Sequence, residues 1–317
     1  MRFRFSFSVL LLGAALLAGY APAARAHGLA FVLNSAGASI SVVDMSKGAE
    51  IRRIPVLREP HHLALSPDGR DLLVGDTVGN EMLFLDPASG AVRQRLPVAD
   101  PYQIGFSPDG KWLTVTGLAR NQVDVYDAKT MSLAKRFPLA SMPSHLAYSP
   151  DSATVYVSLQ GTDRLAAIDL SRMAIVWNVP VGKTPAGVMW HNGRVLVADM
   201  GANTVEIVDP ADGHIERRLV IGRGAHQLFL SPDRMLIYVN ARVDGTTTAL
   251  DAKTLEIKRV YPIPGGPDCI DFAPDGKLWI TQRWASKVAV LDPVSGAHAE
   301  VAVGRSPHGI FLNARAE

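Results

Sequence analysis

The chain has 317 residues, with 32 lysine and arginine residues against 30 aspartate and glutamate residues and a formal net charge of +2. Both signs of charge are interspersed and form no continuous basic stripe, which argues against nucleic acid as a partner. Cysteine occurs once, at Cys269, so no intrachain disulfide can form. Stability must therefore come from burial of apolar surface, which a chain of this length can supply.

The first 26 residues have the pattern of a secretory signal peptide. Arg2 and Arg4 precede an apolar run over residues 9–18, and residues 24–26 form the cleavage pattern Ala-Arg-Ala. The apolar run is too short to span a bilayer, and no later segment approaches the length of a membrane helix. We therefore expect a soluble periplasmic protein that begins at His27, with no membrane span.

A repeat of about 41 residues runs through the rest of the chain. In each unit one strand ends in two apolar residues and an aspartate, at Asp44, Asp86, Asp127, Asp169, Asp209, Asp251 and Asp292. Most units also contain a Ser-Pro-Asp turn or a close variant of it. Seven units of this length, each with several short strands, predict an all-β fold, a seven-bladed β-propeller over residues 27–317.

The second unit shows the four strands expected of a blade. They are residues 61–66, 71–75, 81–85 and 91–98. The third strand is apolar on both faces, as expected for a strand between neighbouring blades, and the outer strand carries charges that protect its edge. The chain begins with a second strand at residues 29–34 and ends with a first strand at residues 308–312, so the C-terminal residues are expected to complete the first blade.

Several segments share one motif of a repeat family. They are Phe31-Val32-Leu33-Asn34, Tyr156-Val157-Ser158 and Ile237-Tyr238-Val239-Asn240, together with Asn-Thr-Val-Glu-Ile-Val-Asp at residues 203–209. In these features the chain resembles the YVTN-repeat β-propellers, and the likeness covers essentially everything after residue 26. The resemblance implies the fold and says little about function, because related propellers include cell-surface proteins, dehydrogenase subunits, lactonase-like enzymes and haem-binding domains of nitrite reductases.

Strand direction places the first two residues of each innermost strand at one rim of the channel, here called the top face. These positions are His61 and His62, Tyr102 and Gln103, Ser144 and His145, Ala186 and Gly187, His226 and Gln227, Asp268 and Cys269, and His308 and Gly309. Five of the nine histidines fall there, where uniform scatter would place about 0.4. The ends of the second strands add Asn34, Asp76, Gln160, Asp199, Asn240 and Gln282 at the same rim.

This clustering predicts a ligand-binding site at the channel mouth. Its expected members are His61, His62, Tyr102, Gln103, His145, His226, Gln227, Asp268, His308, Asp76, Asp199, Asn240 and Arg283. A ring of imidazoles can bind a divalent metal, a haem-like group or an anion, and the expected metal ligands are His62, His145, His226 and His308. The alternative is that a channel mouth is wet and its histidines only satisfy neighbouring backbone groups.

The sequence contains no complete catalytic motif: it has no Gly-x-Ser-x-Gly, His-Glu-x-x-His, Cys-x-x-Cys-His or phosphate loop. We therefore expect an accessory or scaffold protein that binds a small molecule or a periplasmic protein through its top face. One alternative is a metal- or haem-dependent enzyme, either a lactonase-like hydrolase or lyase or an oxidoreductase, because propeller active sites are assembled from distant blades. Another is a structural subunit of a larger complex.

The outer strand of the fourth unit lacks the charges that its counterparts carry. It contains Ile175, Val176 and Trp177, which offer an apolar edge to a partner protein. The other interpretation is that this strand packs against a neighbouring loop of the same chain.

Overall fold

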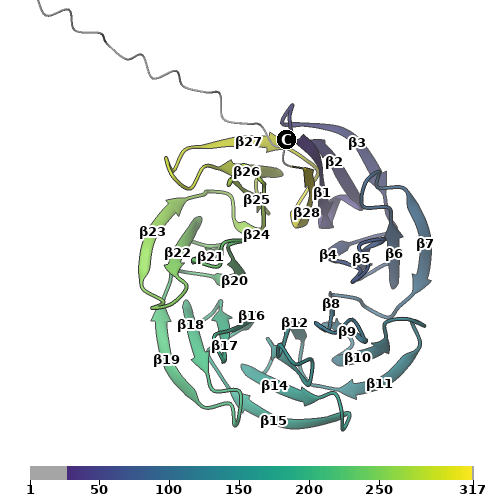
Figure 1. Ribbon diagram of the computed structural model, residues 1–317, viewed down its shortest axis with the longest axis vertical. Coiled ribbons are helices and arrows are strands. Elements are labelled where there is room, and N and C mark those ends of the chain that lie inside the picture. The colour runs from purple at the N-terminus through teal and green to yellow at the C-terminus, as the bar shows by residue number, and fades with distance from the viewer. Residues whose placement is uncertain (1–26, 316–317) are drawn as a thin grey trace, which may run out of the picture.

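The computed structural model describes residues 27–315 as seven four-stranded antiparallel sheets arranged in a ring (Figure 1). The sequence-based prediction of a seven-bladed β-propeller is therefore confirmed. Residues 1–26, for which we predicted a signal peptide, lie outside the described residues. Within residues 27–315, no helix is both long enough and apolar enough to cross a membrane.

The blades follow one another in chain order, except that the first blade takes a strand from the C-terminus. Blade 1 contains β28 (Pro307–Arg315), β1 (His27–Asn34), β2 (Ser39–Asp44) and β3 (Ala49–Pro55), with the short 3-10 helix η1 (Ser35–Gly37). Blade 2 contains β4 (Pro60–Leu65), β5 (Leu72–Asp76), β6 (Glu81–Leu85) and β7 (Val92–Pro97). Blade 3 contains β8 (Gln103–Phe106), β9 (Trp112–Gly117), β10 (Gln122–Asp127) and β11 (Leu133–Pro138).

The other four blades repeat this arrangement. Blade 4 contains β12 (Pro143–Tyr148), β13 (Thr154–Leu159), β14 (Arg164–Asp169) and β15 (Ala174–Pro180). Blade 5 contains β16 (Pro185–His191), β17 (Arg194–Asp199), β18 (Thr204–Val208) and β19 (Ile215–Val220). Blade 6 contains β20 (Ala225–Leu230), β21 (Leu236–Ala241), β22 (Thr246–Asp251) and β23 (Ile257–Pro262). Blade 7 contains β24 (Pro267–Phe272), β25 (Leu278–Gln282), β26 (Lys287–Leu291) and β27 (His298–Ala302).

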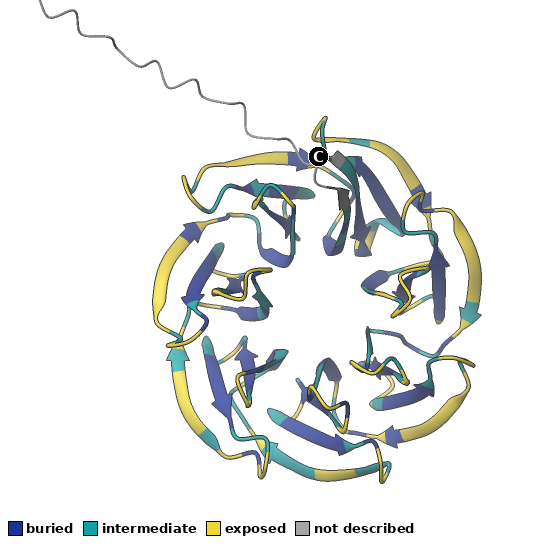
Figure 2. Cartoon of the chain, viewed as in Figure 1, coloured by how far each residue is buried: buried dark blue, intermediate teal, exposed yellow. Residues whose placement is uncertain are grey.

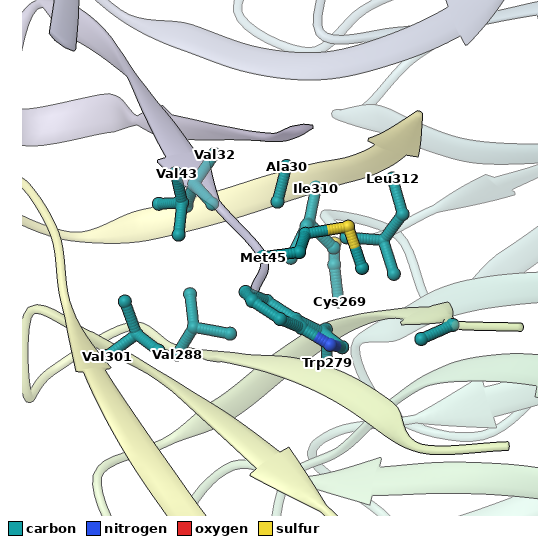
Figure 3. Packing of buried hydrophobic residues seen from close by; sticks show 11 residues of the cluster. Ala30, Val32, Val43, Met45, Cys269, Trp279, Val288, Val301, Ile310 and Leu312 are labelled. Carbon is teal, nitrogen blue, oxygen red and sulfur yellow. The ribbon is translucent and has the colours of Figure 1, made fainter. Parts of the chain in front are cut away.

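The ring closes through antiparallel pairing of β1 with β28, as the strand order predicted. Paired residues include His27 with Arg315 and Val32 with Ile310, so both strands extend beyond the predicted ranges. Figure 3 shows the apolar cluster at this junction, in which Ile310 of β28 and Met45 of blade 1 lie near Trp279 of blade 7. The closure is thus part of the buried core.

Burial changes sharply from the inner strands to the outer one. All five residues of β6 are buried, whereas most of β7 is exposed, and the same contrast recurs around the ring, where the outermost strands are largely exposed (Figure 2). The apolar clusters lie between neighbouring blades; one, for example, joins Val123 and Val125 of blade 3 to Val155 and Val157 of blade 4. Apolar contact between adjacent sheets therefore holds the blades together.

A recurring hydrogen bond fixes where the innermost strands begin. In four blades a polar side chain from the end of the second strand donates to a backbone carbonyl of the next blade. These bonds run from Thr116 to Ser144 (2.6 Å), from Ser158 to Ala186 (2.7 Å), from Asn240 to Asp268 (2.9 Å) and from Thr281 to His308 (2.8 Å). Each acceptor is the second residue of its strand, so these bonds position the backbone that faces the channel axis.

The outer strand β15 makes contacts within the chain. The Trp177 indole donates a hydrogen bond to the Pro210 carbonyl of blade 5 at 3.1 Å, and its ring packs on Tyr156 at 5.7 Å between centroids. Trp177 therefore packs against a neighbouring loop of the same chain, which was one of the two interpretations of this strand. Ile175 and Val176 are exposed, and the contact with a partner protein predicted for them stays a prediction.

Candidate functional site

The top end of the channel axis holds two layers of side chains, one from each of two consecutive positions at the start of the innermost strands. The first layer consists of His61, Tyr102, Ser144, Ala186, His226, Asp268 and His308, and the second of His62, Gln103, His145, Gly187, Gln227, Cys269 and Gly309. Blade 5 contributes no polar side chain, and a Cβ atom on Gly187 would lie 2.6 Å from the His226 carbonyl oxygen. Glycine is required there because blades 5 and 6 approach each other so closely.

Five histidines from four blades form one continuous group, here called the axial cluster: His61, His62, His145, His226 and His308. Centroids of neighbouring rings lie 3.9 Å apart for His61 and His308, 4.5 Å for His62 and His308, 5.1 Å for His62 and His145, and 5.0 Å for His145 and His226. The imidazoles predicted to converge from distant positions in the sequence therefore do meet on the axis.

The axial cluster is buried, contrary to the interpretation of a wet channel mouth. The exposed fraction is 5% for His62 and 2% or less for the other four histidines. Within residues 27–315, Nδ1 of His61 and Nε2 of both His145 and His226 have no hydrogen-bond partner. These imidazoles therefore do not serve to satisfy backbone groups, and their unpaired nitrogens carry an energetic cost.

Asp268 is the charged centre of the site. Its Oδ2 accepts hydrogen bonds from His308 Nδ1 at 2.6 Å and from Arg283 Nη1 at 3.2 Å. Its Oδ1 accepts from Arg242 Nε at 3.0 Å, and His226 Nδ1 lies 3.0 Å from the same oxygen without hydrogen-bond geometry. The carboxylate is fully buried, so both of its oxygens depend on these partners.

The surroundings of the site shift the pKa values of the carboxylate and of the imidazoles so that only the carboxylate is charged at neutral pH. Burial by itself would raise the pKa of Asp268, but the adjacent Arg242 and the nearby imidazoles hold this pKa well below the usual range. Burial lowers the pKa of the imidazoles, to about 4 for His226 and well below the usual value for His308. At neutral pH the site therefore contains an ionised carboxylate beside neutral imidazoles, the form in which histidine binds metals.

His308 has a defined tautomer because of this contact. An ionised carboxylate only accepts hydrogen bonds, so Nδ1 of His308 carries the proton that it donates to Asp268. Nε2 of His308 is then left with its lone pair, and it lies 3.1 Å from Nε2 of His62. A ring nitrogen of His61 joins them, and the three ligand atoms all lie within 4.8 Å of one another.

Two of the four predicted metal ligands, His62 and His308, lie together with His61 in this group. Within residues 27–315, neither His145 nor His226 belongs to a group of three potential ligand atoms of comparable tightness. Nδ1 of His145 is instead hydrogen-bonded to Ser144 Oγ at 2.7 Å.

The YncE-like β-propeller family matches residues 8–317, essentially the whole chain. The chain belongs to this family. The resemblance to repeat propellers found in the sequence is thereby confirmed. A protein of Salmonella typhimurium, "Uncharacterized protein YncE", is 30% identical over 94 residues, which are 29% of this chain and 26% of that relative. The aligned region thus spans about a quarter of the curated relative.

Solved structures share the YncE-like fold at low sequence identity. A dihydro-heme d1 dehydrogenase, NirN, in complex with DHE has a TM-score of 0.68 and 17% identity, over 90% of this chain and 75% of that one. A streptogramin B lyase has a TM-score of 0.67 and 15% identity, over 80% of this chain and 93% of that one. At these identities the likeness shows the fold alone.

Other predicted site residues have structural partners in this YncE-like propeller. Gln103 accepts a hydrogen bond from the Leu146 amide at 2.7 Å, and Gln227 accepts one from the Cys269 thiol at 3.3 Å. Tyr102 lies against His61 with ring centroids 4.0 Å apart and so belongs to the wall of the axial cluster. Asn240 bonds on both sides, donating to the Asp268 carbonyl and accepting from Thr247 at 2.7 Å.

Asp76 and Asp199 occupy equivalent positions at the ends of second strands but have different surroundings. The Asp76 carboxylate accepts three backbone amide hydrogen bonds of 2.8 Å, from Arg58, Glu59 and Gly79, and so closes the loops of blade 2. Asp199 is equally buried, yet the only hydrogen bond to its carboxyl group within the described residues comes from Thr204 at 3.2 Å, and its Oδ1 has no partner. Both carboxylates belong to the packing of their own blades.

The poor solvation of Asp199 predicts a pH-dependent stability. Burial and the neighbouring Glu206 raise the pKa of Asp199 to about 8. The carboxyl contributes stability that is complete below the unfolded pKa of about 4 and is lost as pH rises through 8. We expect Asp199→Asn to raise the melting temperature more at about pH 9 than at about pH 5.

Thermal unfolding followed by circular dichroism at the two pH values tests this prediction. Asp76→Asn is the matched control, because it removes an acceptor of amide hydrogen bonds and should lower the melting temperature at both values. An Asp199→Asn effect that is the same at both pH values would contradict the assigned cause.

The predicted site did not include two features of the molecule, the Arg242 guanidinium and a cavity between blades 6 and 7. Arg242 directly follows β21 as Arg283 follows β25, and this equivalence was the signal that should have added Arg242 to the site. A cavity of about 620 Å³ lies between blades 6 and 7 at the rim of the Ser-Pro-Asp turns, lined by Tyr238, Tyr261 and Phe272 among others. Its aromatic residues come from different strands, so no local pattern marks it.

Proposed function

We propose that this chain is an exported binding propeller that holds one divalent transition-metal ion through His61, His62 and His308. The observation that carries the proposal is the Asp268–His308–His62 arrangement, in which a buried carboxylate orients an imidazole whose free nitrogen faces another imidazole 3.1 Å away. Carboxylates commonly hold metal-binding histidines in this way, by accepting the proton of the other ring nitrogen. Export is supported by the signal-peptide pattern of residues 1–26.

The donor set fits a metal of intermediate softness. Neutral imidazoles suit Zn²⁺, Cu²⁺, Ni²⁺ and Fe²⁺, whereas Mg²⁺ and Ca²⁺ prefer oxygen ligands. A macrocycle fits less well, because ring centroids 3.9–5.1 Å apart leave no room for a haem plane among these side chains. The proposal is therefore a single ion.

A binding role is favoured over catalysis by the chemistry around the cluster. Burial raises the pKa of the Cys269 thiol well above its usual value, and the thiol donates to Gln227, so it is not an activated nucleophile. The number of ligands supports the alternative of a metal-dependent hydrolase or lyase. Three histidine ligands would leave a tetrahedral ion with one open position, as in catalytic zinc sites.

Metal titration tests the proposed function. After treatment with EDTA and dialysis, the protein is expected to bind about one equivalent of Zn²⁺ or Ni²⁺, measured by calorimetry and elemental analysis. His62→Ala and His308→Ala should each abolish binding, with the fold checked by circular dichroism. His214→Ala is the control, because His214 lies with Asp209 and Glu216 in a separate group at the surface.

Two outcomes would contradict the proposal. One is stoichiometric binding that survives His62→Ala and His308→Ala but is lost in His214→Ala, which would place the ion at the surface. The other is the absence of binding in a folded wild-type protein.

A further inference from the structure

Two arginines next to the axial cluster are partly exposed to solvent. Arg242 follows β21 in blade 6 and Arg283 follows β25 in blade 7, and their side chains are 16% and 21% exposed. The carboxylate of Asp268, which both contact, is fully buried. We call Arg242 and Arg283 the arginine pair.

The arginine pair has more hydrogen-bond donors than the site has acceptors. A guanidinium group offers five N–H donors. Arg242 uses Nε and Nη2 on Asp268 Oδ1, and Arg283 uses Nη1 on Oδ2. Within the described part of the chain neither guanidinium bonds to any other acceptor, so Nη1 of Arg242 and Nε and Nη2 of Arg283 remain available.

The site also has an excess of positive charge. Two guanidinium groups contact a single carboxylate, that of Asp268, so the pair has one positive charge more than this partner can balance. A second carboxyl group near Arg283 is that of Glu59, which is half-buried and does not form an ion pair with either arginine. Burial raises the pKa of Glu59, and the charge of Arg283 lowers it. Glu59 is therefore close enough to Arg283 to compete with a bound anion for its positive charge.

We infer that the arginine pair binds a small monoanionic carboxylate at the top end of the axis. The planar guanidinium matches the two oxygens of a carboxylate and can donate to both at once. One negative charge balances the surplus of one positive charge, which disfavours a doubly charged phosphate. This site goes beyond the proposed metal site and does not require the ion, because its donors belong to side chains that are not metal ligands.

The first test is titration of metal-free protein with sodium acetate and sodium pyruvate at constant ionic strength, with sodium chloride as the reference. Ligand binding to the folded state raises the melting temperature, and calorimetry gives the dissociation constant directly. We expect both carboxylates to stabilise the protein beyond chloride. Equal effects of acetate and chloride would overturn the inference, and a larger effect of inorganic phosphate would replace the carboxylate with an oxoanion of higher charge.

Variants then locate the site. Arg283→Gln should weaken acetate binding by about tenfold or more, because hydrogen bonds to charged groups are lost. Arg120→Gln is the matched control in a top loop of blade 3, where the arginine donates to Asn80 at 3.3 Å and does not contact Asp268. Glu59→Gln should tighten binding, because it removes the competing carboxylate.

The Glu59→Gln variant keeps the inference testable even if Arg283→Gln folds poorly. Weaker or unchanged acetate binding in Glu59→Gln would count against the arginine pair. Since all measurements use EDTA-treated protein, failure of the metal titration and failure of carboxylate binding are separate results.

Discussion

Truncation after Ser306 is expected to unfold the entire propeller and not one blade. The deletion removes β28, which is the innermost strand of blade 1, and leaves β1 as an open edge that can pair with other chains. It also removes Ile310 and Leu312 from the apolar cluster between blades 7 and 1 (Figure 3). Because a folded domain is stable by only about 5–15 kcal/mol, loss of one strand from a closed ring should exceed that margin.

Circular dichroism melting and size-exclusion chromatography of the truncated protein measure this effect. We expect no cooperative transition near that of the full-length chain, together with aggregation. Truncation after Arg315 is the control, since it leaves all of β28 in place. A synthetic peptide of residues 305–315 should restore a cooperative transition if strand loss is the cause, whereas a truncated protein that melts like the intact one would refute the closure argument.

Asp268→Ala is expected to have the largest effect of any single substitution in the site. Without the carboxylate, Arg242, Arg283 and His308 lose their common acceptor. Breaking a buried ion pair by removing one partner costs about 3–5 kcal/mol, and the partial exposure of the two arginines favours the lower end because they can turn to solvent.

Urea unfolding gives the free energy of this variant. Asp244→Ala is the control, because Asp244 pairs with Arg223 at the surface and its removal should change stability little. Asp268→Asn is the companion variant for function: it keeps the shape but not the charge, and we expect zinc affinity to fall about 10- to 100-fold. A stable Asp268→Asn protein with unchanged zinc affinity would show that Asp268 does not orient His308.

The fold was predictable because the repeat determines it. Seven aspartates at nearly constant spacing set the number of blades, and the strand count at the two ends predicted that β28 would join β1. The membership of the axial layers also followed, because antiparallel strands of fixed direction bring every innermost strand to the same rim. His61 and His308 are far apart in the sequence, yet this rule alone placed them together.

The finer features of the site depend on packing that sequence patterns do not contain. Which histidine places a ring nitrogen close to those of both His62 and His308 depends on side-chain rotamers and on the angle between blades. A buried aspartate such as Asp76 cannot be distinguished by sequence from a ligand-binding one, because both are polar residues at a strand end. Arg242 was left out of the predicted site because arginines in loops usually serve solvation, although its position after β21 matches that of Arg283 after β25. Its contact with Asp268 is seen only in the structure.

Four hydrogen bonds hold the innermost strands in place without involving the side chains that face the axis. They run from Thr116, Ser158, Asn240 and Thr281 to carbonyl groups of the next blade. They hold the polypeptide through main-chain oxygen atoms, so the side chain at each held position is free to differ, and it is serine, alanine, aspartate and histidine in turn. A propeller built in this way can acquire or discard a reactive group one sector at a time while its architecture stays the same.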